Sequence, residues 1–153
     1  MTRLPSLSDP SFDIDPFENT VFQVWPQEDL DRQGEPFLSV MPISTYMFSD
    51  VTSLLKKHQS NFAALLTAWN PGRRESDEFN AEANQRLYKV LVDSGLPVYP
   101  ARGTEATDNP APWFEDSFLV VGNDYEQFVT WQRAFDQLAF VLFRTDGSVS
   151  LRW

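Results

Sequence analysis

The sequence FAALLTAW, residues 62–69, carries the clearest strand signal of the chain. It is an apolar run of strand length, and it stops at Asn70-Pro71-Gly72, a combination that favours a turn. A continuous apolar run of this kind is typical of a strand that is buried on both faces. We therefore expect such a strand at Phe62–Trp69.

Two helices are indicated downstream by apolar residues at three- and four-residue spacing. Ser76 is a suitable N-cap for the first helix, because acidic residues follow it in the first turn, where the helix dipole favours negative charge. Gly95 suits the position after the last turn of this helix. The expected buried stripes comprise Phe79, Ala83, Leu87, Val90 and Leu91 in the first helix and Phe128, Trp131, Phe135 and Leu138 in the second.

Four further strands are expected around these helices. Asp146-Gly147 is a strong hairpin turn between the last two of them. The segment Arg102–Asp116 is rich in Gly, Thr, Asp, Asn and Pro and is predicted to be a long loop, which is uncommon in a compact domain unless the loop has a function or is disordered. The strands are predicted at Leu96–Ala101, Ser117–Val121, Ala139–Arg144 and Ser148–Trp153.

The element order predicted for the core domain, residues 61–153, is β-α-β-β-α-β-β. This order favours an α+β fold, a ferredoxin-like split β-α-β sandwich with helices on one face of a mostly antiparallel sheet. Residues 1–60 contain six of the 11 prolines and are expected to form an irregular N-terminal extension with short strands and one short helix. These elements are predicted at Thr20–Trp25, Phe37–Met41 and Ser49–Gln59, and the sequence leaves open whether the strands join the sheet or wrap around its surface.

The composition excludes several classes of function. The 153 residues carry 12 basic and 22 acidic side chains, a net charge of −10. Direct nucleic-acid binding is not expected, because that affinity comes from neutralising phosphates with Lys and Arg. The chain has no Cys and one His, which excludes disulfides, thiolate nucleophiles and zinc sites built from Cys or several His. No cofactor and no metal site are predicted.

The first ten residues, MTRLPSLSDP, lack the apolar run of a signal peptide. The apolar segments of the chain are also too short to span a bilayer. We therefore expect a cytoplasmic location and no membrane association.

Polar residues gather at the carboxyl end of the Phe62–Trp69 strand. Trp69 can pack its ring while its N–H requires a partner if buried, and the amide of Asn70 can bond either a ligand or the turn backbone. Arg73 and Arg74 precede the Ser76 cap, where free helix N–H groups favour an anion such as a phosphate or carboxylate. The alternative for the two arginines is an exposed, solvated pair.

Asn80 and Asn84 are unusual in a helix interior and share one helix face with Tyr88. Hydrogen bonds to a ligand or to the long loop would explain them, and a solvated polar face is the alternative. Farther along the chain, Glu115 and Asp116 are adjacent carboxylates that can act as acid and base or hold a cation. Adjacent residues of an extended chain point to opposite sides, however, which argues against one shared site.

Several short motifs recur in the order found in a known family. They are TAWNP at residues 67–71 and E-x-SFLV-x-G at 115–122, together with Ser76, Asn84, Gly95, Pro100, Gly103, Phe135 and Gln137. Over roughly residues 61–147 the chain resembles an uncharacterised bacterial family, a domain of unknown function of about this size. The resemblance implies no particular activity, substrate or catalytic residue. It does imply a pocket rather than only a core, because its polar positions fall at strand ends and in loops.

We expect this pocket where these segments converge. Its candidate ligand-binding residues are Trp69, Asn70, Arg73, Ser76, Asn80, Asn84, Arg102, Gly103, Glu115 and Ser117. The set offers amides, hydroxyls, aromatic rings and Arg without an obvious nucleophile, which favours a non-catalytic binding module for a small polar or anionic ligand. Two alternatives stay open: an acidic protein that binds or inhibits a basic protein partner, and a hydrolase-like enzyme that uses Glu115 or Asp116.

Overall fold

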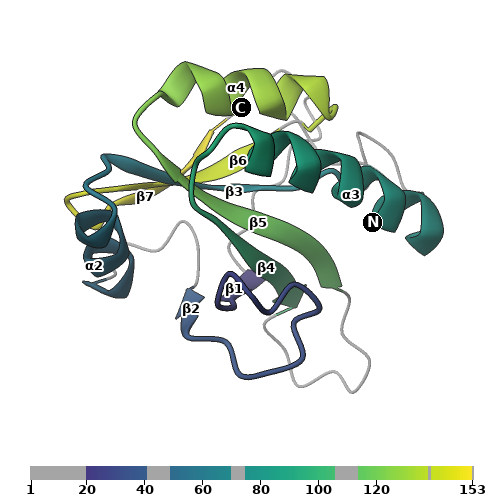
Figure 1. Cartoon of the computed structure of the whole chain (residues 1–153), viewed down its shortest axis with the longest axis horizontal. Helices are drawn as coiled ribbons and strands as arrows, with labels where there is room; N and C mark the ends of the chain where they lie inside the picture. The colour runs from purple at the N-terminus through teal and green to yellow at the C-terminus, as the bar shows by residue number, and fades with distance from the viewer. Residues whose placement is uncertain (1–19, 41–48, 70–74, 106–113, 138, 153) are drawn as a thin grey trace.

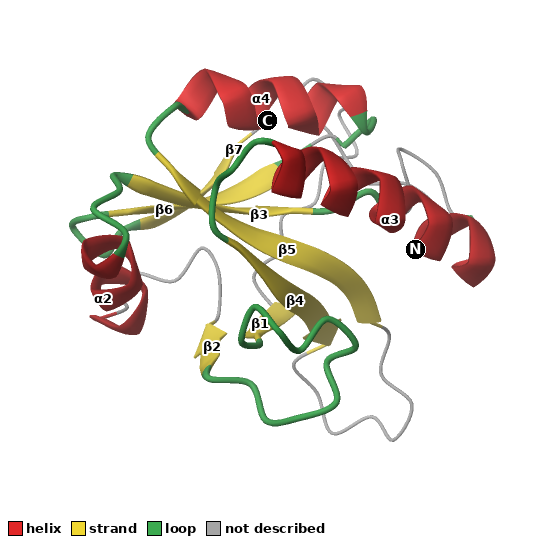
Figure 2. Ribbon diagram, in the orientation of Figure 1, coloured by secondary structure: helices red, strands yellow, loops and turns green. Residues whose placement is uncertain are grey.

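A computed structural model describes residues 20–40, 49–69, 75–105, 114–137 and 139–152. These residues form seven strands and three helices (Figure 2). The elements are β1 (Thr20–Val24), β2 (Leu38–Val40), α2 (Ser49–Lys57), β3 (Phe62–Leu66), α3 (Asp77–Asp93), β4 (Val98–Glu105), β5 (Phe114–Gly122), α4 (Tyr125–Ala134), β6 (Phe140–Arg144) and β7 (Val149–Arg152).

The seven strands form one sheet in the order β2-β1-β4-β5-β3-β6-β7, and all neighbouring strands are antiparallel. The sheet curls into a half-barrel. Helices α3 and α4 lie over one face of the sheet, whereas α2 lies apart from them at the opposite face (Figure 1). Residues from both sheet edges, Leu38 of β2 and Leu151 of β7, join the same cluster as α2, so α2 packs against the inner face of the curl.

The predicted ferredoxin-like split β-α-β sandwich is wrong. The helices and strands expected after residue 61 are present in the expected order, but the sheet does not end with them. Strand β1 pairs with β4 from Thr20–Glu105 to Val24–Ala101, and β2 pairs with β1. Because strand twist accumulates across a wide sheet, these additions and β7 at the other edge produce a curled half-barrel rather than a two-layer sandwich with an irregular extension.

Each face of the sheet carries its own hydrophobic core. Along β3, Ala63 and Leu65 belong to the inner core with α2, and Ala64 and Leu66 belong to the outer core with α3 and α4. All four are at most 4% exposed. The prediction of a strand buried on both faces is therefore confirmed, although the strand ends at Leu66 rather than at Trp69.

Helix α3 begins and ends as its capping residues predict. The Oγ of Ser76 accepts a hydrogen bond from the backbone N–H of Phe79 at 3.1 Å. After the C-cap Ser94, Gly95 adopts φ +81°, a left-handed conformation that glycine allows without strain. These caps fix the length and position of the helix that forms one wall of the candidate site.

The predicted loop Arg102–Asp116 is shorter than expected. Strand β4 continues to Glu105 and β5 begins at Phe114, and their register pairs Arg102 with Asp116 and Gly103 with Glu115. Residues 106–113 lie outside the described residues. The strand register therefore places these predicted site residues on the sheet itself.

None of the helices in the described ranges has the length and apolar character needed to cross a bilayer.

Candidate functional site

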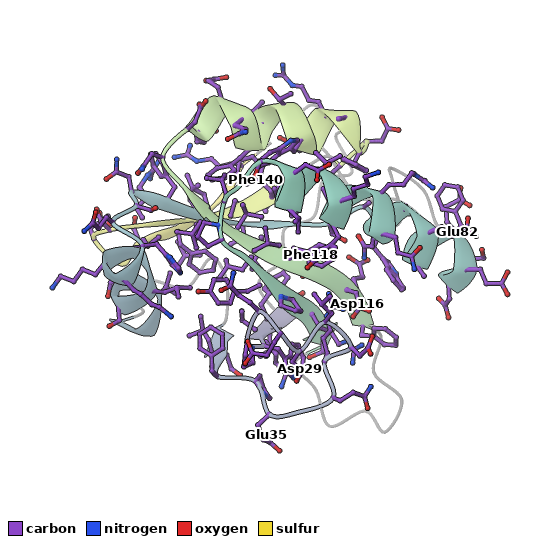
Figure 3. All side chains as sticks on the ribbon, viewed as in Figure 1. Asp29, Glu35, Glu82, Asp116, Phe118 and Phe140 are labelled. Atoms are coloured by element: carbon purple, nitrogen blue, oxygen red, sulfur yellow. The ribbon has the colours of Figure 1, made fainter. Side chains whose placement is uncertain are left out.

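A cleft of about 390 Å³ lies between helix α3, strand β5 and the loop that joins β1 to β2. We call it the α3 cleft. Figure 3 shows Asp116 and Phe118 between α3 and that loop, which carries Asp29. The α3 cleft is lined by Leu30, Asp31, Arg32, Trp69, Ala81, Asn84, Gln85, Tyr88, Asp116 and Phe118.

The side-chain amide of Asn84 forms the floor of the α3 cleft. Strands β3 and β5 pair as far as Leu66 and Phe118, and beyond that point they separate. Asn84 fills the gap: its Oδ1 accepts from the N–H of Ala68 and its Nδ2 donates to the carbonyl of Asp116, both at 2.8 Å. At 5% exposure, this asparagine bridges a helix and two strands and belongs to no solvated face.

The segment after β3 is held by other polar side chains as well. The Oγ1 of Thr67 donates to the carbonyl of Asp116 at 2.7 Å and accepts from the N–H of Trp69 at 3.0 Å. The Nε2 of Gln137 donates to the carbonyl of Trp69 at 3.1 Å. Trp69 is therefore fixed at the cleft wall, 7% exposed, with its ring tilted against Phe114 at 6.0 Å between centroids.

Arg32 closes the cleft from the β1–β2 loop. Its Nε donates to the carbonyl of Ala101 and one terminal nitrogen donates to the carbonyl of Ser117, both at 2.8 Å, while the other terminal nitrogen donates to the carbonyl of Leu30 at 3.0 Å. Burial lowers the pKa of the guanidinium, and the nearby charge of Asp116 opposes that effect. An arginine remains protonated under such shifts. The three carbonyl oxygens therefore stabilise a buried positive charge.

The loop that carries Arg32 has hydrogen bonds of its own. The carboxylate of Asp29 accepts from the backbone N–H groups of Gln33 and Gly34, at 2.9 and 2.8 Å. The indole N–H of Trp25 donates to the carbonyl of Gly34 at 2.8 Å. These bonds hold the loop in one conformation, in which Arg32 has a positive φ of 57°.

Asp116 is the charged centre of the cleft. Its Oδ1 accepts from the Nε of Arg102 at 2.7 Å, and the Nε of Arg32 lies 3.8 Å away. The guanidinium of Arg102 also lies over the ring of Phe114, 4.6 Å from its centroid, and 5.9 Å from that of Trp25. The contact with Arg102 holds the carboxylate of Asp116 in place. At 22% exposure, the side chain is still accessible from the cleft.

Aromatic rings supply the apolar part of the cleft. Tyr88 of α3 and Phe118 of β5 stack at a tilt, with 5.3 Å between ring centroids. The guanidinium of Arg32 lies over Phe118 at 5.3 Å. Together with Trp69 these rings form walls suited to a flat molecule, and the polar atoms of Gln85 and Asp116 lie beside them.

The candidate residues from the sequence divide between two places. Trp69 and Asn84 line the α3 cleft, and Arg102 adjoins it through Asp116. Glu115 and Ser117 line a separate cavity on the inner face of the sheet. The adjacent carboxylates Glu115 and Asp116 thus serve opposite faces of β5, as their alternation predicts.

Three further candidates have structural contacts. Ser76 caps α3, and the Nδ2 of Asn80, a residue 1% exposed, donates to the carbonyl of Glu75 at 3.4 Å. Gly103 lies so close to β1 that a Cβ at this position would lie 2.9 Å from a ring carbon of Phe22. Asn70 and Arg73 lie outside the described residues. The described candidates therefore lie at the α3 cleft, at a separate cavity or in structural contacts, and their role in ligand binding stays a prediction.

The residues contributed by the β1–β2 loop could not be found from sequence patterns. The segment Gln27–Pro36 has the composition of a polar loop, in which a lone arginine is ordinarily solvated. Arg32 instead bonds carbonyls 69 and 85 positions away. Only the sheet order, which brings β1 beside β4, makes those contacts accessible.

Within the described ranges, no group of three or more His, Cys, Asp and Glu side chains is arranged to hold a metal ion.

A comparison with protein families gives a match inside this fold. Residues 66–140 form a domain described as "Protein of unknown function (DUF3293)". The matched region runs from the end of β3 to the start of β6 and includes two walls of the cleft, α3 and β5, but not the β1–β2 loop. The motifs and bacterial origin expected from the sequence stay predictions. The comparisons with curated proteins and with solved structures gave no match.

Proposed function

We propose that this protein is a binding module whose α3 cleft takes a small polar ligand with a flat ring. The proposal is carried by one observation: a cleft of about 390 Å³ that is lined by the rings of Tyr88, Phe118 and Trp69 together with Asp116, whose carboxylate is held by Arg102. Ligand sites in proteins are ordinarily concave, largely apolar and supplied with a few placed polar groups.

The chemistry of the lining favours recognition over turnover. The cleft polar groups Asn84, Arg32 and Asp116 all have fixed protein partners. These hydrogen bonds and the ion pair hold the cleft walls rigid, which lowers the entropic cost of binding a ligand. A nucleophile with an adjacent base is not found among the described lining residues.

The ligand is expected to bring hydrogen-bond donors. Because the guanidinium of Arg32 donates to three main-chain carbonyls, a ligand would meet mainly the carboxylates of Asp31 and Asp116 and the amide of Gln85. The positive charge available to an anionic group would be that of Arg102, which adjoins the cleft and whose side chain is 30% exposed. We therefore favour a neutral or donor-rich ligand over an anion.

The two alternatives from the sequence gain less support. Glu115 and Asp116 lie on opposite faces of β5, so they do not form one acid–base pair for a hydrolase. A basic protein partner is suggested by the net charge of −10 alone and stays a prediction.

The test compares ligand retention when the cleft is open and when it is filled. Ala81 is an exposed α3 residue in the cleft lining, so Ala81→Trp would fill the cleft without removing a hydrogen-bonding side chain. The neighbouring Glu82 is exposed and does not line the cleft, and Glu82→Trp provides the matched control (Figure 3). Native mass spectrometry of the three proteins, each purified from a bacterial host with gentle desalting, reports any bound small molecule by its mass.

We expect a reproducible small-molecule adduct on the parent protein and on Glu82→Trp, and its loss from Ala81→Trp. An adduct of equal abundance on all three proteins would place the ligand outside the α3 cleft. A parent protein that carries no adduct, and that is not stabilised against heat by any member of a panel of ring-containing amides, would contradict the proposal.

A further inference from the structure

A second cavity, of about 50 Å³, lies inside the curl of the sheet. Its apolar walls include Phe22 of β1, Leu65 of β3, Val141 of β6 and Leu151 of β7. It shares no lining residue with the α3 cleft, because alternate residues of β5 face opposite sides of the sheet. The cavity is therefore a site of its own, independent of the proposed function.

Two buried polar atoms in the lining of this cavity have no hydrogen-bond partner within the described part of the chain. They are the Oγ of Ser117 and the Oε1 of Gln137. The two residues are 3% and 5% exposed. A buried polar atom without a partner costs free energy, so native proteins nearly always provide one, either from the chain or from a bound molecule.

The orientation of the Gln137 amide is set by its other contacts. Its Nε2 donates to the carbonyl oxygens of Trp69 at 3.1 Å and of Phe135 at 3.3 Å. Since carbonyl oxygens only accept, the nitrogen must face them and the oxygen must face elsewhere. Gln137 therefore presents an acceptor, and the hydroxyl of Ser117 can donate or accept.

Water alone suits this cavity poorly. A cavity needs roughly 10–15 Å³ for one water, and each buried water requires two to four polar partners. The cavity has room for several waters, but its two orphan polar atoms supply partners for about one. The other polar residues of the lining, Thr67 and Glu115, already have interactions within the chain. A small molecule that is polar at one end and apolar at the other would match both the volume and the walls.

We propose that this cavity binds a small uncharged molecule of about four heavy atoms that ends in a primary amide or hydroxyl, or that same end group of a longer ligand. The ligand donates an N–H or O–H to the Oε1 of Gln137 and exchanges a hydrogen bond with the Oγ of Ser117. Its alkyl part contacts Leu65, Val141 and Leu151. Because the Oε1 of Gln137 only accepts and a carboxylate has no hydrogen to donate to it, the site disfavours anions.

The probe for this proposal is acetamide, with acetate as its isosteric anion. Acetamide titrated into the full-length, isotope-labelled protein should shift the signals of Ser117 and of the Gln137 side-chain amide in a saturable way. Its methyl group should give intermolecular nuclear Overhauser effects to Leu65, Val141 and Leu151. Acetate at the same concentrations should give neither effect.

Two matched serine variants test the contact. Ser117→Ala removes the hydroxyl and should weaken acetamide binding by about fivefold to tenfold, the effect of one lost hydrogen bond. Ser150 of β7 is the control, because its buried hydroxyl also has no partner in the described ranges but lies outside the cavity lining. Ser150→Ala should therefore leave acetamide binding unchanged. Equal weakening in both variants would overturn the proposal.

Titrations of the parent protein with acetamide and with acetate also test the proposal. Acetamide shifts that never saturate, or acetate binding as strong as that of acetamide, would overturn the proposal. Nuclear Overhauser effects from water to the methyl groups of Leu65, Val141 and Leu151, with none from acetamide, would show that the cavity holds water only and would overturn the proposal.

Discussion

The Nδ2 of Asn84 lies 2.8 Å from the main-chain oxygen of Asp116 and joins helix α3 to strand β5 where β5 separates from β3. The same amide accepts from the N–H of Ala68 at 2.8 Å. Together with the Oγ1 of Thr67, which also donates to the carbonyl of Asp116, this side chain replaces hydrogen bonds that a continued β ladder would have made. Because the cleft opens at this separation, its shape depends on the Asn84 amide.

Replacing Asn84 by Ala should destabilise the protein by about 2–4 kcal/mol, because it leaves a buried N–H without its acceptor and weakens the bonding of a carbonyl. Replacement by Asp should cost at least as much, since a carboxylate accepts from Ala68 but cannot donate to the carbonyl of Asp116. Denaturant unfolding measures both changes. Gln85→Ala, at the exposed neighbouring position, is the control and should change stability by less than about 0.5 kcal/mol.

Arg32→Lys should destabilise the protein by about 1–3 kcal/mol. A lysine ammonium is a point charge and cannot span the carbonyls of Ala101, Ser117 and Leu30 as the planar guanidinium does. The positive φ of residue 32 would then lose the contacts that hold it. Unfolding by denaturant gives the stability, and amide hydrogen exchange in the β1–β2 loop should accelerate.

Arg86→Lys is the matched control, because Arg86 is exposed on α3. It should leave both the stability and the loop exchange rates unchanged. Loop exchange rates in Arg32→Lys that equal those of the parent would show that the guanidinium does not hold the loop.

The sequence predicted individual elements better than their arrangement. Phe62–Leu66 is apolar throughout, and the structure buries both of its faces. The width and curl of the sheet could not be predicted, because they depend on pairing between segments far apart, such as Val24 with Ala101. Local patterns show that a strand forms but do not show which edge it joins.

The candidate site was predicted in part for the same reason. Two asparagines in a helix interior signalled an unusual role for Asn84, but its partners Ala68 and Asp116 come from segments that only the strand register brings together. Arg32 carried no signal at all. The residue type at one position indicates what a side chain can bond, and the topology decides what lies within reach.

Gly103→Ala should destabilise the protein by about 1–3 kcal/mol. The added methyl group would lie 2.9 Å from Cε1 of Phe22 and 3.2 Å from Cγ2 of Thr20, so the Phe22 ring must move. Phe22→Leu removes the ring and should recover part of this cost. A double-mutant cycle measured by thermal unfolding should therefore give a favourable coupling of at least about 0.5 kcal/mol between the two substitutions. Strict additivity would show that the clash is relieved elsewhere.

The single histidine gives a pH dependence that can be assigned to one residue. The Nε2 of His58 lies 2.6 Å from the hydroxyl of Tyr99, and burial, followed by the charge of Lys57, lowers the pKa of His58 below 6.5. A lowered folded-state pKa means that the unfolded chain binds more protons between the two pKa values. The contribution of His58 to stability is therefore complete above pH 6.5 and is lost as the pH falls toward the folded-state pKa.

We expect the melting temperature of the parent protein to decrease as the pH falls from 7.5 to 5.5, and the decrease to be smaller in His58→Gln, which does not titrate. An NMR titration of the imidazole should give a midpoint below 6.5. Because burial is the larger cause, Tyr99→Phe should leave the pKa of His58 below that value even though the hydroxyl partner is lost. A midpoint above 6.5 in the parent would mean that the folded protein stabilises the charged imidazole, and the contribution of His58 to stability would then change with pH in the opposite direction.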